Sequence, residues 1–166
     1  MSDGGSREGG QRISRVSAWG RAALILAIVV GLDQGAKHLI IASIAQGEER
    51  PVFPAVSLVH VRNSGVAFSV LAGGHTLLVV AVIVLALGGL VAYFATHAAR
   101  PLLWLPTGLL MGGALGNIVD RARDGAVTDF IKLPLWPAFN VADMAITVGV
   151  LALLFVLDSS REARGA

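Results

Sequence analysis

Runs of about 20 apolar residues constrain this chain more than any other feature of its sequence. An α-helix rises about 1.5 Å per residue, so roughly 20 apolar residues cross the ~30 Å hydrocarbon core of a bilayer. Four runs have about this length: two lack ionisable side chains over most of their course, and two carry a few polar residues inside. The chain is 55% hydrophobic and only 14% charged, with a mean hydropathy of +0.73, which also fits a membrane protein. We therefore expect an all-α integral membrane protein with four transmembrane helices, at about 22–44, 76–95, 101–121 and 139–157.

Charge and residue types narrow the possible partners and cofactors. The formal net charge is +2 and the basic residues lie largely in the tails, so no nucleic-acid partner is expected. The chain has no cysteine, which excludes disulfides, a thiolate nucleophile and cysteine-bound metals. Its histidines stand singly, without the paired spacing of a metal site, so neither a metal nor another cofactor is expected. They are His38, His60, His75 and His97.

The two ends of the chain differ from its apolar interior. Residues 1–18 are rich in Gly, Ser and Arg without apolar periodicity, and we expect a disordered tail there. Its arginines indicate a cytoplasmic location by the positive-inside rule, and four spans return the C-terminal tail, 161–166, to the same side. Arginines also occur in segments that this topology puts outside, which weakens the bias. Between the tails, 19–160 is expected to form a single membrane domain.

Two segments between the spans lie on the extracytoplasmic side in this topology. In residues 51–70, short alternating β-branched runs are bounded by proline and by an Asn-Ser-Gly turn at 63–65. This pattern predicts a small β structure at the membrane surface, within about 46–72. The second segment, 120–138, carries several acidic residues.

Polar residues inside the spans fall on shared helix faces. Asp33 and Lys37 are four residues apart with the acid first, which is the favourable order for an ion pair on one face. The simplest interpretation of this pair is a snorkelling lysine or an ion-paired lock. Asn117, Asp120 and Arg121 also share a face, and they present an amide, a carboxylate and a guanidinium where the third span leaves the membrane.

The third span carries a row of small residues. Gly108, Gly112 and Gly116 recur every four residues. Such a row allows a neighbouring helix to approach closely, so we interpret it as a packing surface.

Asn140 and Asp143 share a face at the start of the fourth span. The helix dipole stabilises an acid at this end by about 0.3–1 kcal/mol, whereas translocon scales give a cost of about 2.5–3.5 kcal/mol for a central Asp. An acid slightly inside the membrane therefore needs a partner or a purpose, and Asp129, between apolar neighbours, is the natural partner. Asp120 is the rival, but it adjoins Arg121, which is expected to compensate its charge and make it a poor proton donor.

Two carboxyl groups at a membrane-facing site have a known chemical use. Within hydrogen-bond reach they cannot both ionise, so one can act as a base and the other as an acid near neutral pH. The base activates water against an amide carbonyl, and the acid protonates the oxyanion or the leaving amine. The pair therefore indicates an aspartic peptidase that needs no acyl-enzyme.

Two other function classes stay open. A small proton-coupled transporter or channel would use Asp33, Lys37 and Asp143 as an intramembrane relay, with acids near the midplane. A non-catalytic assembly protein would need its acids for folding only. Most acids cluster at one end of the spans, which favours chemistry at the membrane surface, and peptide cleavage by the purified protein would separate the three classes.

Short motifs occur in order along almost the whole chain after the tail. They are 33-DQGAK-37, 63-NSGVAF-68, 112-GGALGNIVDR-121 with 125-GAVTDF-130, and 139-FNVAD-143. Together they resemble the motifs of bacterial lipoprotein signal peptidases (signal peptidase II), which are aspartic peptidases of the inner membrane. The chain departs from that pattern at Gln34 and Ala36, beside the matching Asp33 and Lys37.

The resemblance implies a fold, a reaction and a site. The fold is four transmembrane helices with both termini cytoplasmic and a small extracytoplasmic β-cradle. The reaction is removal of signal peptides from prolipoproteins, by cleavage before a diacylglyceryl-modified cysteine, with membrane lipid as a further partner and a monomer as the expected state. The implied catalytic residues are Asp129 and Asp143. The expected substrate-binding and supporting residues are Asn63, Gly65, Asn117, Asp120, Arg121, Asn140, Ala142, Asp33 and Lys37.

Overall fold

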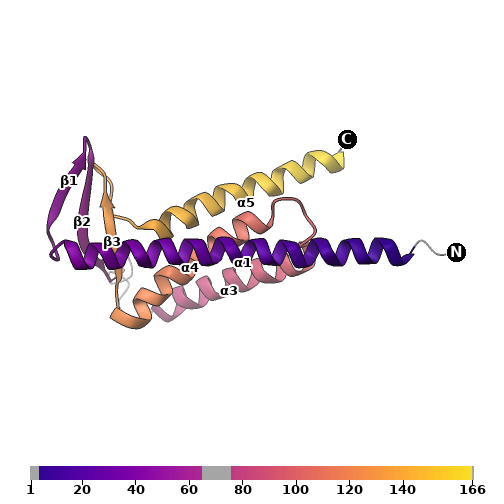
Figure 1. Ribbon diagram of the computed structural model, residues 1–166, viewed down its shortest axis with the longest axis horizontal. Coiled ribbons are helices and arrows are strands. Elements are labelled where there is room, and N and C mark those ends of the chain that lie inside the picture. Colours follow the sequence, from indigo (N-terminus) through magenta and orange to yellow (C-terminus); the bar gives the residue numbers. More distant parts are fainter. Residues whose placement is uncertain (1–3, 65–75, 166) are drawn as a thin grey trace.

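Four long helices and a small sheet make up the described part of the chain (Figure 1). The computed structural model describes the backbone of residues 4–64 and 76–165 and side chains within 15–64 and 83–159. The strands stand together at one end of the helices, and the start of α1 and the end of α5 lie at the other end (Figure 1). In chain order the elements are α1 (Gly4–Ser43), β1 (Glu49–Phe53), β2 (Val56–Asn63), α3 (Thr76–His97), α4 (Trp104–Asp124), β3 (Val127–Lys132) and α5 (Val141–Gly165).

Helix α1 begins earlier than the sequence analysis predicts. It starts at Gly4, within the segment expected to be a disordered tail, and continues for 40 residues to Ser43. This stretch contains no proline, so nothing in it removes a backbone donor and interrupts the helix once the apolar part has formed. At about 1.5 Å per residue the helix is roughly 60 Å long, about twice the hydrocarbon thickness of a bilayer.

Two helical stretches of the described chain are long and apolar enough to cross a membrane. They are Arg15–Ser43, where the mean hydropathy over an 18-residue window reaches 1.7, and Val141–Ser159, where it reaches 2.1. In α3 a shorter apolar stretch, Ile83–His97, is found. Helix α4 is less apolar because glycines and a charged last turn lower its hydropathy. The mostly helical fold with a small sheet agrees with the sequence analysis.

Glycines on α4 bring two helices close to it. A Cβ added at Gly112 would lie 2.8 Å from the Cβ of Val29 on α1, and one added at Gly113 would lie 2.5 Å from the carbonyl oxygen of Ala142 on α5. Side-chain atoms do not fit at such distances, so these positions require glycine. The predicted packing row is therefore confirmed for α1, and Gly113 adds a second close contact, with α5.

The sheet has the order β1-β2-β3, with both pairs antiparallel. Strands β1 and β2 form a hairpin whose turn includes Ala55, at φ 65°. Strand β2 ends at Asn63, where the sequence predicts a turn, and the remainder of the predicted β segment, from 65 onward, lies outside the described residues. Strand β3 joins the hairpin from far along the chain, because Val61 pairs with Asp129.

The sheet rests on the end of α1 through a small apolar cluster. Phe130 of β3 is buried against Ile40 and Ile44. The buried His60 of β2 shares a 2.9 Å hydrogen bond between its Nδ1 and the carbonyl oxygen of Ile44. These contacts fix β3, and therefore Asp129, against the helix that carries Asp33 and Lys37.

Candidate active site

A tight connection between β3 and α5 brings the two predicted catalytic acids near each other. The backbone N–H of Phe139 donates to the carbonyl of Ile131 at 3.0 Å, and that of Ile131 donates back at 2.8 Å. This bridge closes the loop between strand and helix. Asp129 lies two residues before the bridge, and Asp143 lies four residues after it, in the first turn of α5.

One amide side chain joins the two acids. Asn140 precedes α5 and caps it, because the backbone N–H of Asp143 donates to Asn140 Oδ1 at 2.9 Å. In return the backbone N–H of Asn140 donates to Asp143 Oδ2 at 3.2 Å, which completes a capping box with Asp in the fourth position. The Nδ2 of the same amide donates to Asp129 Oδ1 at 2.7 Å. The Asn140 side chain thus both caps α5 and links the two acids.

Two further amides occupy the remaining carboxyl oxygens. Asn63 Nδ2 donates to Asp129 Oδ2 and Asn117 Nδ2 donates to Asp143 Oδ1, each at 2.9 Å. Each oxygen of the pair therefore accepts an N–H, and among the described residues the hydrogen bonds of both carboxyl groups run to amides. The amides of Asn63, Asn117 and Asn140 thus surround the two carboxyl groups.

The two acids have different surroundings. Asp129 is buried, with 2% of its surface exposed, whereas Asp143 is half-buried. Burial raises the pKa of Asp129 above its usual range, and the nearby Asp143 charge raises this pKa further, against a lowering by the Asn63 hydrogen bond. Such a difference between two carboxyls is what an acid–base pair requires.

A buried network lies directly behind the pair; we call Asp33, Lys37 and Asp120 the Lys37 network. The ammonium of Lys37 lies 2.7 Å from Asp33 Oδ2 and 2.8 Å from Asp120 Oδ2, and it donates to Asn117 Oδ1 at 3.2 Å. Asp33, Lys37 and Asp120 are 0%, 3% and 6% exposed. The ion pair predicted between Asp33 and Lys37 is therefore present, with Asp120 as a second partner.

Both aspartates of the Lys37 network hold the backbone next to a candidate catalytic acid. Asp33 Oδ1 accepts the backbone N–H of Ala142 at 2.9 Å, one residue before Asp143. Asp120 Oδ2 accepts the backbone N–H of Thr128 at 3.1 Å, one residue before Asp129. A single lysine thus connects the backbone supports of the two acids.

The sequence analysis expects Arg121 to compensate the charge of Asp120, but the two side chains do not pair in the structure. Adjacent residues on a helix point in different directions, and Arg121 is exposed, with its Nη1 donating to the carbonyl oxygen of Asn117 at 3.3 Å. The charge of Asp120 is compensated by Lys37 instead.

Gln34 is a contributor that sequence reasoning treats only as a departure from the motif. Its Nε2 donates to Asp120 Oδ1 at 2.8 Å and to the carbonyl oxygen of Gly116 at 3.2 Å. The available signal is a polar amide within an apolar run, next to Asp33. Gly65, another expected site residue, lies outside the described residues. In the part of the chain whose side chains are described, no three His, Asp or Glu groups are arranged to hold a metal ion.

The comparisons with known proteins agree with this arrangement. A solved bacterial membrane enzyme, determined by the in meso method at 1.9 Å resolution, matches with a TM-score of 0.74 and 33% identity, over 83% of this chain and 92% of that one. The curated lipoprotein signal peptidase of Pelotomaculum thermopropionicum is 39% identical over 144 residues, which are 85% of this chain and 95% of the relative. That of Moorella thermoacetica is 41% identical over 135 residues, 81% of this chain and 90% of the relative.

The similarities in fold and sequence therefore place the chain in a class of membrane-bound aspartic peptidases. The family model for signal peptidase (SPase) II matches residues 25–158, which include every element of the site. The chain belongs to the signal peptidase II family.

Proposed function

We propose that this chain is an aspartic endopeptidase of the bacterial cytoplasmic membrane that removes signal peptides from diacylglyceryl-modified prolipoproteins. Family membership supports the activity and the substrate class, and it does not favour the transporter alternative. The observation that carries the catalytic assignment is the Asn140 amide, which touches both Asp129 and Asp143. Cleavage before the lipid-modified cysteine is part of the proposal, and so is a monomeric enzyme.

In the proposed mechanism the two acids have separate roles. Asp143 is half-buried and acts as the base that activates water against the scissile carbonyl. Asp129 is buried, its pKa is raised, and it acts as the acid that protonates the oxyanion or the leaving amine. Since amides occupy their oxygens, a proton moves between the acids by way of the water or the substrate. Arg121 holds a peptide carbonyl of the substrate.

The supporting residues act by position. Asn63, Asn117 and Asn140 orient the carboxyl groups through the contacts described above. Asp33 and Asp120 hold the backbone before each acid, and Lys37 compensates their charge. These five groups and Lys37 are proposed as positioning residues rather than catalytic ones.

We also propose the topology expected from the sequence. Four helices span the membrane within one domain, 19–160, both termini are cytoplasmic, and the sheet and the acid pair lie on the extracytoplasmic side. The shared end of the chain termini, opposite the sheet, supports this arrangement (Figure 1). Labelling of single cysteines introduced in β1 and near the C-terminus, in intact and lysed cells, would test it, because the chain has no native cysteine.

Cleavage of a diacylglyceryl-modified prolipoprotein by the purified protein tests the function. Asp129→Asn and Asp143→Asn are each expected to lower turnover by roughly 10³–10⁵-fold while substrate binding persists. Asp158→Asn, an exposed aspartate of the same helix about 22 Å along the axis from Asp143, is the matched control and should cleave normally. Near wild-type cleavage by Asp129→Asn, together with an inactive but folded Asp120→Asn, would move the acid role to Asp120.

A further inference from the structure

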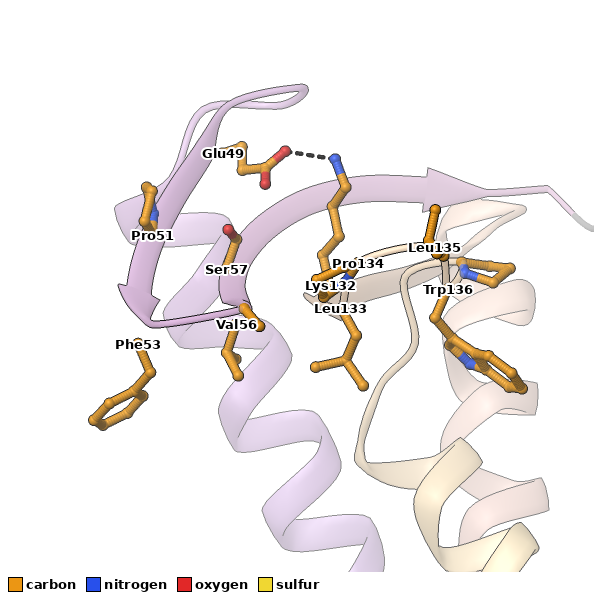
Figure 2. A pocket seen from close by; sticks show the side chains of 12 residues that line it. Glu49, Pro51, Phe53, Val56, Ser57, Lys132, Leu133, Pro134, Leu135 and Trp136 are labelled. Atoms are coloured by element: carbon orange, nitrogen blue, oxygen red, sulfur yellow. Dashed lines mark hydrogen bonds and ion pairs between the residues drawn. The ribbon is translucent and has the colours of Figure 1, made fainter.

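A groove lies on the sheet at some distance from the acid pair. It has a volume of about 560 Å³ and is formed by the β1–β2 hairpin and the loop 133–137 after β3 (Figure 2). Ser57, at the groove, lies four residues before Val61, which pairs with Asp129, so the two sites are roughly 13 Å apart along β2. The groove lining shares no residue with the amides and acids of the proposed active site.

The two sides of the groove differ in polarity. On one side Glu49 and Lys132 form an ion pair at 2.5 Å. On the other side the side chains of Phe53, Leu133 and Trp136 point in the direction of the helices (Figure 2). The groove region is therefore amphipathic, with its apolar side toward the helical part of the molecule.

Large apolar side chains stand exposed around the groove. Phe53 is 73% exposed, Trp136 is 65% exposed, and Leu135 is fully exposed. The backbone of Leu135 has φ 60°, a conformation that bulky residues rarely adopt, and yet it presents a leucine. In water, three such side chains around one groove would form an unfavourable apolar patch.

The same apolar surface continues onto the adjoining helices. Leu39 and Ile41, at the end of α1 that carries the sheet, are 67% and 50% exposed. Met144, in the first turn of α5, is 48% exposed. In the proposed membrane location, lipid covers the exposed faces of these apolar helices. The exposed apolar side chains around the groove extend this surface onto the sheet. Trp and other aromatic side chains favour the boundary between hydrocarbon and headgroups.

We propose that the groove rim (Phe53, Leu133 and Trp136) enters the outer leaflet and contacts the acyl chains of membrane phospholipids near the glycerol level. The Glu49–Lys132 pair faces the water above it. This contact fixes the height of the sheet, and so of Asp129, relative to the bilayer. The inference rests on the membrane location proposed above and does not depend on peptidase activity.

Depth-dependent fluorescence quenching tests the contact. The chain has three tryptophans, so Trp19→Phe with Trp104→Phe leaves Trp136 as the single reporter in the full-length protein. The protein is placed in phosphatidylcholine vesicles without substrate, with bromines on the acyl chains either close to the glycerol or near the methyl end. Bromines close to the glycerol are expected to lower Trp136 emission at least about two-fold, and deep bromines less.

A tryptophan on the opposite face of β1 provides the matched control. Arg50 alternates with Glu49 and Pro51 along the strand and does not line the groove. In a chain lacking the three native tryptophans, Arg50→Trp should be quenched by aqueous acrylamide and little affected by brominated lipid. If Trp136 behaves as this control does, the rim faces water and the proposal is wrong. Cleavage activity is not measured here, so that result leaves the proposed peptidase function untouched.

A second measurement covers the case in which the tryptophan variants fail to fold. Phe53→Cys creates the only cysteine in the chain and can carry a nitroxide spin label with all tryptophans kept. Greater access to oxygen than to a water-soluble nickel chelate supports lipid contact. The reverse ratio overturns it.

Discussion

The side chain of Asn140 takes part in the start of a helix and in the acid pair at once. Its Oδ1 caps α5, and its Nδ2 holds Asp129. Asp and Asn are about equally good N-caps, but only Asn has the N–H donor. The two duties of this residue can therefore be separated by a single substitution.

We expect Asn140→Asp to keep the fold and lose activity. The cap oxygen remains, so α5 should still form, but a second carboxyl beside the buried Asp129 should lower the melting temperature. The loss of the Nδ2 donor should lower kcat about 10–100-fold, as for other residues that orient a reactive group. Asn140→Ala should lower both, with about 1 kcal/mol of stability lost through the cap. Thermal melts and initial rates in detergent measure the two effects, and an active Asn140→Asp enzyme would contradict the role of the Nδ2 donor.

The raised pKa of Asp129 leads to a prediction about pH. Asp129 keeps its proton to a higher pH than an ordinary aspartate, so the acid is lost as the pH rises through its raised pKa. At the acid end the rate falls because a general base acts only in its unprotonated form. The profile of kcat against pH should therefore be bell-shaped. A rate that only rises between about pH 4 and 9 would exclude Asp129 as the acid.

Helix α4 is the element that sets the distances between the other parts of the site. It carries Asn117 and Asp120, and its glycines let α1 and α5 approach within side-chain contact. Gly113 lies against Ala142, the residue before Asp143. The contact that packs α4 against α5 therefore also places the Asp143 carboxyl group.

Gly113→Ala should therefore damage activity as well as stability. The new methyl would meet the carbonyl oxygen of Ala142 at 2.5 Å, which forces α5 away and displaces Asp143. Gly88→Ala on α3 is the control, since a Cβ there meets nothing within 4 Å and alanine is favoured over glycine in helices by about 0.5–1 kcal/mol. Melting temperature and kcat of both variants check this, and an equal response of the two would show that the glycine contact is unimportant.

Sequence reasoning reached the local parts of this site and missed the parts that depend on packing. Asp33 with Lys37, and Asn140 with Asp143, lie within one helical turn, so spacing predicts them. The Lys37–Asp120 pair joins residues far apart on α1 and α4, and it depends on how closely the glycines let these helices pack. The pairing of Val61 with Asp129 depends on a strand register that the sequence does not fix.

At the scale of the whole molecule, the Lys37 network connects α1, α4 and α5 with the sheet. Lys37 and Asp33 are on α1, Asp120 is on α4, and the two backbone groups that these aspartates hold belong to β3 and α5. The Lys37 ammonium lies between the two buried carboxylates of Asp33 and Asp120. Its removal would leave both carboxylates buried without a compensating positive charge.

Lys37→Met is accordingly expected to destabilise the protein by about 3–5 kcal/mol. It should also abolish cleavage, because the backbone next to Asp129 and Asp143 loses its support. Adding Asp33→Asn and Asp120→Asn to Lys37→Met removes the uncompensated charges and should restore much of the stability without restoring full kcat. Denaturation in detergent and kcat of the single and triple variants are the measurements. If the triple variant were as active as the wild type, the network would have no positioning role.

The capping box at the start of α5 ties the catalytic cycle to the mechanics of a helix. In the proposed mechanism, each time Asp143 takes a proton from the attacking water, the negative charge at the positive end of the α5 dipole is lost, and Oδ2 becomes a weaker acceptor for the Asn140 N–H. The first turn of α5 is then at its least stable while the tetrahedral intermediate exists, and it regains its full strength only when the proton leaves. In that mechanism, turnover alternately loosens and tightens the start of α5.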